Sequence, residues 1–421
     1  MKHTYLLTLS FLSVAHVVGM ESHSSLLLSS RTDGCTPLRS TFNSRSHSKL
    51  PALLPNSDTE ENGYLAKEGV SIPMELAPSR RVPVVALSID GGGIRGLIPA
   101  HLFTQIEFKT GYKMWQLADL IAGTSTGGIL ALGLSTMDET EQDACFAAHD
   151  LLHMYREQGD IVFTPKPFSL GSLARAKYKE RPFYQLLSSY FKDSTLSKSM
   201  TDVVVTSFDI GRKKPKFFKS YAGAKDPHHD FFRRDVARAT SAAPTYFKPA
   251  KIFSLPDQYN DRLGIDAIDG GMCANNPALC AFSEALYLYP DATDIIIASF
   301  GTGHATVPLR YHDAKKMGAV GWGMQIANIT IDGPADVVDY QMNQISKTFS
   351  GRVQYFRFQT ELQKANAAMD NVSADNLTTL EHRAEEIART PKFNEFIQLL
   401  QSLPLTPERR TLRSRIAEEN Q

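Results

Sequence analysis

A serine between two glycines is the first feature of this sequence that points to chemistry. Residues 123–127 read GTSTG and match G-x-S-x-G, the pattern in which a sharp turn between a strand and a helix raises a serine nucleophile above a sheet. An apolar stretch precedes Ser125 and a predicted helix follows it, so the positive end of the helix dipole would point at the serine oxygen. The bare pattern is common by chance, because glycine and serine are frequent residues. Its place between a strand and a helix favours a nucleophile over an ordinary turn.

A serine nucleophile needs a base, and the sequence offers an imidazole or a carboxylate. Among the histidines downstream, His304 has the best setting, because it follows a predicted strand in the stretch FGTGHA. Asp269 is the stronger candidate, although Asp-Gly-Gly alone is also an ordinary turn signal. It ends a short apolar stretch, and the two glycines after it let a backbone or a substrate come close. A carboxylate in a low-dielectric site is basic enough to take the proton directly. Asp266 is a rival, weakened by its position inside the same strand.

A second glycine-rich stretch, VVALSIDGGGIRGLIPA at 84–100, passes from a predicted buried strand into a predicted helix. Gly91, Gly93 and Gly96 match G-x-G-x-x-G, the loop that holds the pyrophosphate of a dinucleotide. Such a site also requires an acidic residue about 20 positions further on, at the end of the second strand. Asp119 stands instead at the start of its strand, so the sequence argues against a dinucleotide site.

The glycine loop has another use if it lies beside the serine. The loop and Ser125 both follow carboxyl ends of predicted strands, where sites form in open α/β sheets. The backbone N–H groups of Gly91, Gly92 and Gly93 would then form an oxyanion hole, in which one donor is worth roughly 3 kcal/mol of transition-state stabilisation. Arg95 would either hold this loop in shape or meet a substrate phosphate.

Strands and helices alternate between residues 81 and 310, which is typical of a mostly parallel sheet covered on both faces. The predicted strands are 82–89, 117–122, 202–208, 216–220, 265–268 and 294–300. The predicted helices include 97–108, a helix from the serine turn to about 134, 141–157, 233–240 and 276–288. Residues 311–421 predict a mainly helical extension packed on this domain, with one strand near 353–358. Two amphipathic helices, 376–390 and 392–403, complete it, and Asn376 is the candidate cap of the first.

The N-terminal part differs in composition from the rest of the chain. Residues 1–19 resemble a short signal peptide, which predicts export; the alternative is a disordered tail on a cytoplasmic or membrane-peripheral protein. Residues 20–80 predict a flexible linker rich in Ser, Pro, Asn and Arg. The cysteines Cys35, Cys145, Cys273 and Cys280 match no zinc pattern. The four either form two disulfides in an oxidising compartment or stay as thiols. We expect Cys145 and Cys280 to be buried thiols, because both stand in apolar, helix-like surroundings.

Charge and hydropathy limit the choice of partner. The chain has 421 residues and a formal net charge of +0, which gives no electrostatic reason to expect a nucleic acid. It contains no run of 18 apolar residues, so a membrane-spanning helix is not expected.

Three motifs in order resemble the patatin-like phospholipase family: DGGGIRG at 90–96, GTSTG at 123–127 and DGG at 269–271. The stretch RDVARATSAAPTYFKP at 234–249 is similar to the family's segment between its nucleophile and its aspartate. NNPA at 275–278 is similar to the stretch that follows the aspartate. The resemblance covers about residues 82–302, and the sequence departs from the family in none of the three motifs.

The resemblance implies a Ser–Asp dyad without histidine, with Ser125 as nucleophile, Asp269 as base and the glycine loop as oxyanion hole. It implies an α/β fold, a three-layer α/β/α sandwich, and calcium-independent lipid acyl hydrolysis with no metal or other cofactor. The residues that support the motifs, by matching position, are Asp90, Arg95, Gly96, Gly123, Gly127, Gly270 and Gly271.

The expected substrate is a glycerolipid, first of all a phospholipid, met at a membrane surface, and a need for a protein activator stays open. Residues 165–173 and 244–256 combine aromatic residues with lysine, and these loops either touch the membrane or pack on the protein's own core. Two other functions remain as alternatives. One is a His-assisted esterase of small soluble esters, and the other is a non-catalytic storage or binding protein of the same fold.

Overall fold

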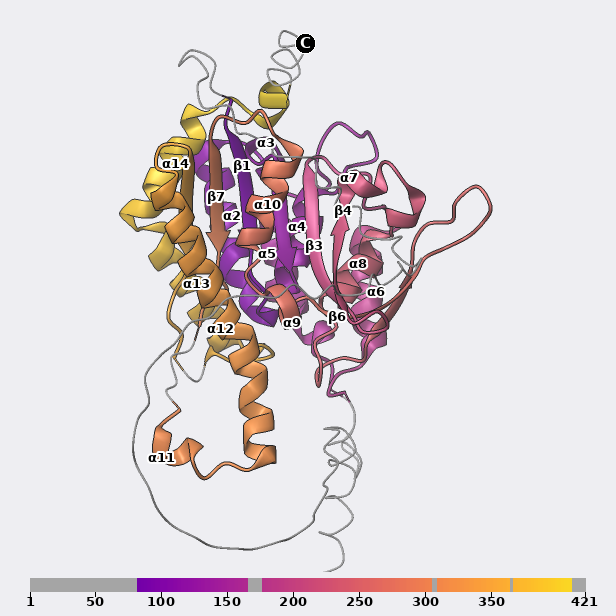
Figure 1. Ribbon diagram of the computed structural model, residues 1–421, viewed down its shortest axis with the longest axis vertical. Helices are drawn as coiled ribbons and strands as arrows, with labels where there is room; N and C mark the ends of the chain where they lie inside the picture. Colours follow the sequence, from indigo (N-terminus) through magenta and orange to yellow (C-terminus); the bar gives the residue numbers. More distant parts are fainter. Residues whose placement is uncertain (1–81, 166–175, 305–308, 364–365, 411–421) are drawn as a thin grey trace, which may run out of the picture. The chain divides into compact units, whose positions relative to one another are not determined.

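The computed structural model describes residues 82–165, 176–304, 309–363 and 366–410 (Figure 1). All of them belong to the second of the two units into which the chain divides, residues 71–421. The predicted signal peptide and linker lie outside the described residues. The strands of the sheet are β1 (Val84–Ile89), β2 (Leu120–Thr124), β3 (Asp202–Asp209), β4 (Lys214–Lys219), β5 (Ala250–Phe253), β6 (Gly264–Asp269), β7 (Ile295–Phe300) and β8 (Val353–Phe358).

The strands form one sheet of order β5-β6-β3-β2-β1-β7-β8, in which β4 also pairs with β3. The pairs β1–β2, β1–β7, β2–β3 and β7–β8 are parallel. The pairs β3–β4, β3–β6 and β5–β6 are antiparallel. The predicted parallel sheet is therefore confirmed for its greater part, and the antiparallel strands gather at one edge.

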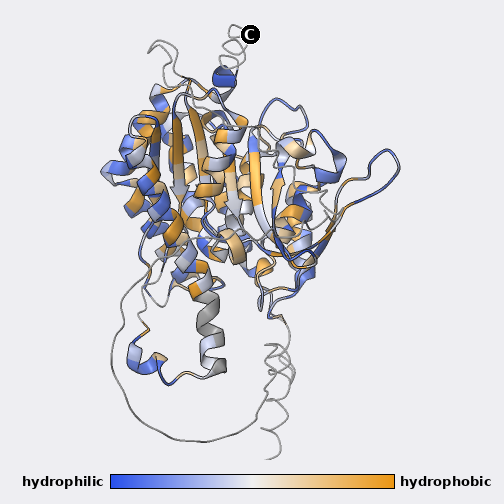
Figure 2. Ribbon diagram, viewed as in Figure 1, coloured by the Kyte–Doolittle hydropathy of each residue, from blue (hydrophilic) through white to orange (hydrophobic). Residues whose placement is uncertain are grey.

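Helices cover both faces of this sheet. They are η1 (Gly93–Gly96), α2 (Leu97–Thr110), α3 (Met114–Leu117), α4 (Thr126–Ser135), α5 (Ala148–Val162), α6 (Glu180–Phe191), α7 (Ser220–Gly223), η3 (Pro227–His229), α8 (Arg233–Thr240), α9 (Gly271–Ala274), α10 (Ala278–Leu288), α11 (Tyr311–Ala314), α12 (Ala319–Thr348), α13 (Ala374–Ala388) and α14 (Pro391–Ser402). Figure 2 shows the strands as the most continuously hydrophobic elements, as expected of a sheet buried on both faces.

Alternation along β1 shows how the sequence builds the layers. Val85, Leu87 and Ile89 belong to one apolar cluster, which includes residues of α2, α4, α5, α13 and α14. Val84 and Ala86 belong to a second cluster, with α10 and α12. Since successive strand residues point to opposite faces, the two clusters lie on the two sides of the sheet. The architecture is therefore the predicted three-layer α/β/α sandwich.

The C-terminal segment adds to the sheet as well as covering it. Strand β8 pairs in parallel with β7, and α13 packs on α2. Near the end of the described chain, the buried Arg409 forms an ion pair of 2.9 Å with Asp119, at the amino end of β2. In the described ranges, no helix is both long enough and apolar enough to cross a membrane.

Some predicted elements were wrong in their bounds or environment. The predicted helix at 141–157 begins only at Ala148, because the Asp138 side chain accepts hydrogen bonds from the N–H groups of Thr140 and Gln142 and closes a turn there. Helix α6 and the short edge strand β5 were not predicted. The N-cap of α13 is Ser373 rather than Asn376, because the Ser373 side chain accepts the hydrogen bond from the N–H of Asn376.

The environment predicted for one cysteine was also wrong. Cys145 is exposed and stands before α5 rather than in a helix. Cys273 and Cys280 are half-buried, and all three of these cysteines are free thiols. Cys35 lies outside the described residues.

Candidate active site

Ser125 lies on the sharp turn that the glycine pattern predicts, between the end of β2 and the start of α4. Its backbone has φ 54° and ψ −119°, a conformation that is strained for a residue with a side chain. Gly127 makes the turn possible, because a Cβ atom there would collide with the carbonyl of Ile89 at the end of β1. Helix α4 can thus start close against the sheet, and its N-terminus lies at the serine.

Asp269 reaches Ser125 from the antiparallel part of the sheet. On the β3 side, strand β6 pairs with the last three residues of β3, and Asp269 is opposite Ser207. Thr206, one residue earlier in β3, pairs with Thr124 at the end of β2. The C-terminal end of β6 therefore lies next to the C-terminal end of β2, which Ser125 follows, although β6 is antiparallel to β3.

The two side chains form a hydrogen bond. Ser125 Oγ donates to Asp269 Oδ2 at 2.6 Å, and Asp269 Oδ1 accepts the N–H of Gly271 at 2.7 Å. Asp269 is 6% exposed, and this burial raises its pKa from 3.8 to about 6, although its two hydrogen bonds act in the opposite direction. The carboxylate is therefore a stronger base than a solvated aspartate.

The C-terminal end of α8 holds both residues of this pair. The N–H of Ser125 donates to Thr240 Oγ1 at 2.8 Å, and the carbonyl of Thr240 accepts the N–H of Gly270 at 3.1 Å. The carbonyl of Ala242 accepts the N–H of Asp269, also at 3.1 Å. One short segment thus fixes the backbone of the serine and of the aspartate.

The glycine loop lies over the serine. A Cβ atom placed at Gly91 would lie 3.3 Å from Ser125 Cβ. The N–H of Gly91 donates to the carbonyl of Asn275 at 3.1 Å, so it is not available to an oxyanion, contrary to prediction. The N–H groups of Gly92 and Gly93 donate to no acceptor among the described residues, and they remain the candidate donors.

Residues distant in sequence support this loop. Thr302 Oγ1 donates to the Gly91 carbonyl at 2.7 Å, and the N–H of Ile94 donates to the carbonyl of Met369 at 2.8 Å. Gly93 has φ +62°, and a Cβ atom there would collide with the same Met369 carbonyl. A glycine is therefore required at this position both by conformation and by space.

Two arginines stabilise the ends of the loop. Arg357 of β8 donates to both carboxylate oxygens of Asp90, at 3.0 and 2.6 Å. Arg95 is buried, and its Nε donates to the carbonyl of Gly92 at 3.2 Å. Burial lowers the pKa of Arg95. Of the two uses predicted for Arg95, the structure shows the one that holds the loop.

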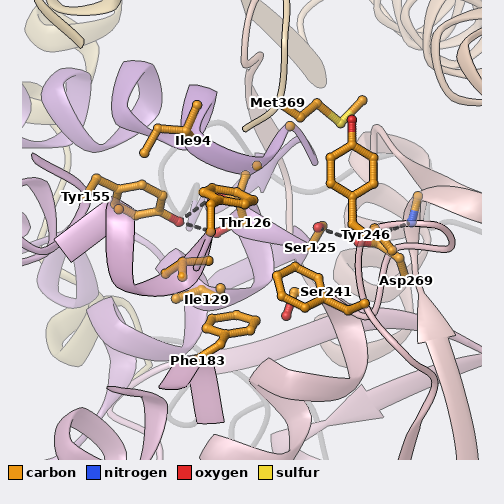
Figure 3. Close-up of a pocket in the computed structure, with 18 of the residues that line it drawn as sticks. Ile94, Ser125, Thr126, Ile129, Tyr155, Phe183, Ser241, Tyr246, Asp269 and Met369 are labelled. Atoms are coloured by element: carbon orange, nitrogen blue, oxygen red, sulfur yellow. Dashed lines mark hydrogen bonds between the residues drawn. The ribbon is translucent and has the colours of Figure 1, made fainter. Parts of the chain in front are cut away.

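An apolar cavity of about 200 Å³ opens beside Ser125 and Asp269 (Figure 3). Figure 3 shows Ile94, Ile129 and Phe183 across the cavity from the Ser125–Asp269 pair. The apolar and aromatic side chains that line it are Ile94, Ile129, Met154, Tyr155, Val162, Phe163, Phe183, Leu186, Leu187, Ala243, Pro244, Tyr246, Phe247, Met272, Ile331 and Met369. A lining of this kind suits a hydrocarbon chain.

The comparisons with known proteins agree on one family. Residues 87–282 match the model of the patatin-like phospholipases. The chain is 33% identical to Patatin-like protein 2 of Arabidopsis thaliana, over 73% of this chain and 83% of that protein. It is 30% identical to Patatin-2-Kuras 3 of Solanum tuberosum, over 73% of this chain and 84% of that protein. The chain belongs to the patatin-like phospholipase family. Membership of this family supports a lipid acyl hydrolase activity.

Neither of the rival bases of this patatin-like protein, His304 and Asp266, lines the cavity beside Ser125. The N–H of His304 donates to the carbonyl of Thr360, and its carbonyl accepts the N–H of Leu362. Among the described residues, no histidine lines the cavity. Asp266 is exposed, and its carboxylate lies 4.0 Å from Lys251. Nowhere in the described chain do three or more His, Cys, Asp or Glu side chains form a group that could hold a metal ion.

The loops of residues 165–173 and 244–256 were predicted either to touch the membrane or to pack on the protein's own core. Residues 166–175 lie outside the described residues, and they include most of the first loop. In the second loop, Tyr246 and Phe247 line the cavity, and the Phe247 ring packs 5.2 Å from that of Phe183. The first part of this loop therefore packs on the protein's own core.

Proposed function

We propose that this patatin-like protein hydrolyses fatty-acyl esters of glycerolipids through an acyl-Ser125 intermediate, with Asp269 as general base and without calcium. The observation that carries the proposal is the 2.6 Å hydrogen bond from Ser125 Oγ to Asp269 Oδ2 at the wall of an apolar cavity. A proton acceptor, a nucleophile and a place for an acyl chain therefore adjoin one another.

In the acylation step, Ser125 Oγ attacks the ester carbonyl and its proton passes to Asp269 Oδ2. The negative charge that develops on the carbonyl oxygen is stabilised by the N–H groups of Gly92 and Gly93 and by the N-terminus of α4. Asp269 then returns the proton to the leaving alcohol, which is a lysolipid when the substrate is a phospholipid. The bond between the acyl carbon and the alcohol oxygen breaks, and the acyl chain stays on Ser125.

In the deacylation step, Asp269 takes a proton from a water molecule, which attacks the acyl carbon. The fatty acid leaves and Ser125 Oγ regains its proton, so the cycle closes without net change in the protein. The raised pKa of Asp269 supports this role, because its conjugate acid can give the proton back near neutral pH.

The substrate class is proposed from the cavity and from the family. The lining is dominated by aliphatic and aromatic side chains, which favours a long acyl chain over a small soluble ester. Phospholipid is the first choice, and a galactolipid, a lysophospholipid or a neutral acylglycerol would undergo the same chemistry.

The test is fatty-acid release from mixed phospholipid vesicles in excess chelator. We expect release by the wild type and by His304→Ala, and at least a hundredfold loss in Ser125→Ala and in Asp269→Asn. Loss in His304→Ala with activity left in Asp269→Asn would show that the base is wrongly assigned. No release by folded wild type on any of these lipids would favour a non-catalytic binding protein or a missing activator.

A further inference from the structure

The segment of residues 309–333, called here the arm, projects from the sheet domain. It comprises α11 and the first half of α12. Figure 1 shows it extending beyond the edge of the sheet at which the parallel strands end. Ser125 follows the end of β2 at this same edge, so the arm lies on the active-site side of the domain.

The arm exposes several large apolar side chains. Leu309, Tyr311, Trp322 and Ile329 are exposed, Tyr311 by 81%. None of the described side chains between residues 309 and 330 is buried. Trp322 and Ile329 are seven residues apart in α12 and thus lie on one face of the helix. An exposed group of this kind marks an interaction surface.

Basic residues accompany these apolar ones. Arg310, Lys315 and Lys316 are exposed, and the only acidic residue between 309 and 318 is Asp313. Lys315 Nζ lies 5.8 Å from the centre of the Tyr311 ring. Aromatic and basic residues together on a short helical segment are typical of elements that lie at the surface of a bilayer with anionic lipids.

The arm also leads into the active site. Ile331 lines the cavity beside Ser125. The next residue, Asp332, lies near the buried Arg95, and its negative charge raises the pKa of Arg95, which burial lowers. A surface that holds the tip of the arm would therefore face the cavity. A lipid must leave a bilayer to reach Ser125, and the arm extends from the edge of the sheet at which Ser125 follows β2.

We propose that the arm docks this protein on the surface of a lipid bilayer, with Trp322 and Ile329 among the head groups and with the basic residues on anionic lipids. This proposal rests on the proposed function for its choice of partner. A bilayer is favoured over a protein partner because the charge, the aromatic residues and the adjoining acyl cavity all suit a lipid surface.

The chain offers its own reporters, since it contains two tryptophans. Trp322 is in the arm. Trp115 is in α3, just before the amino end of β2, and its Nε1 donates to Asp143 at 2.9 Å. Trp115→Phe leaves Trp322 as the reporter, and Trp322→Phe leaves Trp115. Both are made in a Ser125→Ala background, so that the vesicles stay intact.

The experiment measures fluorescence quenching by vesicles of phosphatidylcholine and phosphatidylglycerol with brominated acyl chains. We expect quenching of Trp322 and none of Trp115, with weaker binding on phosphatidylcholine alone and at high salt. Binding to the vesicles without quenching of Trp322 would overturn the proposal. A blue shift of Trp322 that grows with protein concentration in the absence of lipid would also overturn it, because the occupant would then be a second copy.

Activity separates this proposal from the proposed function. In the otherwise wild-type protein, Trp322→Ser with Ile329→Ser should lower release from vesicles by about tenfold or more, since two large apolar side chains are lost from the contact. Hydrolysis of a short-chain p-nitrophenyl ester in solution should change less than about twofold. Equal loss on both substrates would mean that the arm shapes the site itself. No hydrolysis of either substrate by the wild type would overturn the proposed function, whereas the quenching result would still stand.

Discussion

The backbone N–H of Ser125 donates to the hydroxyl of Thr240, at 2.8 Å. The amide of the nucleophile is thus occupied by a side chain of another helix and does not point at a substrate. The carbonyl of the same threonine accepts the N–H of Gly270, the residue after Asp269. Thr240 therefore couples the positions of the two reacting residues through hydrogen bonds to backbone N–H groups, and neither of these bonds involves the Ser125 hydroxyl or the Asp269 carboxylate. We regard it as a positioning residue.

Thr240→Val tests this role, because valine keeps the shape of threonine and removes the hydroxyl. The N–H of Ser125 would then be buried without an acceptor, at a cost of about 1–3 kcal/mol. We expect kcat for a soluble ester to fall about tenfold or more, with KM nearly unchanged, because the nucleophile is displaced while the cavity is intact. Steady-state kinetics measures both constants.

Thr240→Ser is the matched control, since it keeps the hydroxyl and should restore most of kcat. If valine and serine lower kcat to the same extent, the hydroxyl is not what positions Ser125. If valine lowers only the free energy of unfolding, the role of Thr240 is structural alone.

The local parts of the site could be predicted from the sequence. Gly127 lets α4 start against β1, and the glycine loop must approach the serine turn closely. Both turns therefore need glycines at fixed positions, and this spacing is visible in the sequence. Such turns depend on the residues inside them. The β–α alternation likewise predicts the three layers, because each strand needs apolar side chains on both faces.

The residues that support the site could not be predicted, because they reach it through long-range contacts. Arg357 lies 267 positions from Asp90, and Thr240 lies 115 positions from Ser125. Arg357 stands in no distinctive local pattern, and Thr240 lies in the family-like stretch at 234–249, which does not by itself indicate a contact with Ser125. The direction of β6 was also not evident, since an apolar stretch that ends in Asp-Gly-Gly reads the same in a parallel or an antiparallel strand. To predict its direction, one would have to know which strands β6 pairs with.

The raised pKa of Asp269 predicts a pH profile for the reaction. The carboxylate must be ionised to accept the serine proton, and its pKa in the folded protein is about 6. We expect kcat/KM on a soluble ester to rise with pH, with a midpoint about 6, and to be about tenfold lower at pH 5 than on the plateau. A profile that is flat from pH 5 to pH 8 would contradict Asp269 as the base. His304→Ala should leave the midpoint in place.

The same pKa predicts that the base lowers stability at neutral pH. Folding raises the pKa of Asp269 above its ordinary value of 3.8, so the folded protein holds this proton more tightly than the unfolded chain. The stability from this proton is present below about pH 4 and is lost as the pH rises through about 6. At pH 8, Asp269→Asn should therefore unfold with a free energy higher than wild type by up to about 3 kcal/mol. Urea unfolding at pH 8 and pH 4 measures the difference, which should disappear at pH 4.

Gly93 and Gly111 form a matched pair that separates backbone strain from close contact. Both have a positive φ, +62° and +76°, but a Cβ atom at Gly93 meets the Met369 carbonyl, whereas one at Gly111 meets nothing within 4 Å. Gly111→Ala should cost about 1 kcal/mol of unfolding free energy and leave hydrolysis unchanged. Gly93→Ala should cost on the order of 3 kcal/mol and lower kcat at least tenfold, because the loop must move away from Ser125. Equal effects of the two substitutions on kcat would argue against Gly93 as part of the oxyanion hole.

The buried ion pair between Asp90 and Arg357 predicts a double-mutant cycle. Burial raises the pKa of Asp90, and Arg357 opposes this by its charge and its hydrogen bonds. In Arg357→Met the buried carboxylate of Asp90 loses its ion pair and both hydrogen bonds to Arg357, which should cost about 3–5 kcal/mol of unfolding free energy at pH 8. The loss should shrink in acid, where the unpaired carboxyl takes up a proton and its charge disappears. Asp90→Asn combined with Arg357→Met removes both charges and should recover most of the stability in urea unfolding. If the double variant is as unstable as the sum of the two single ones, the pair does not act as a unit.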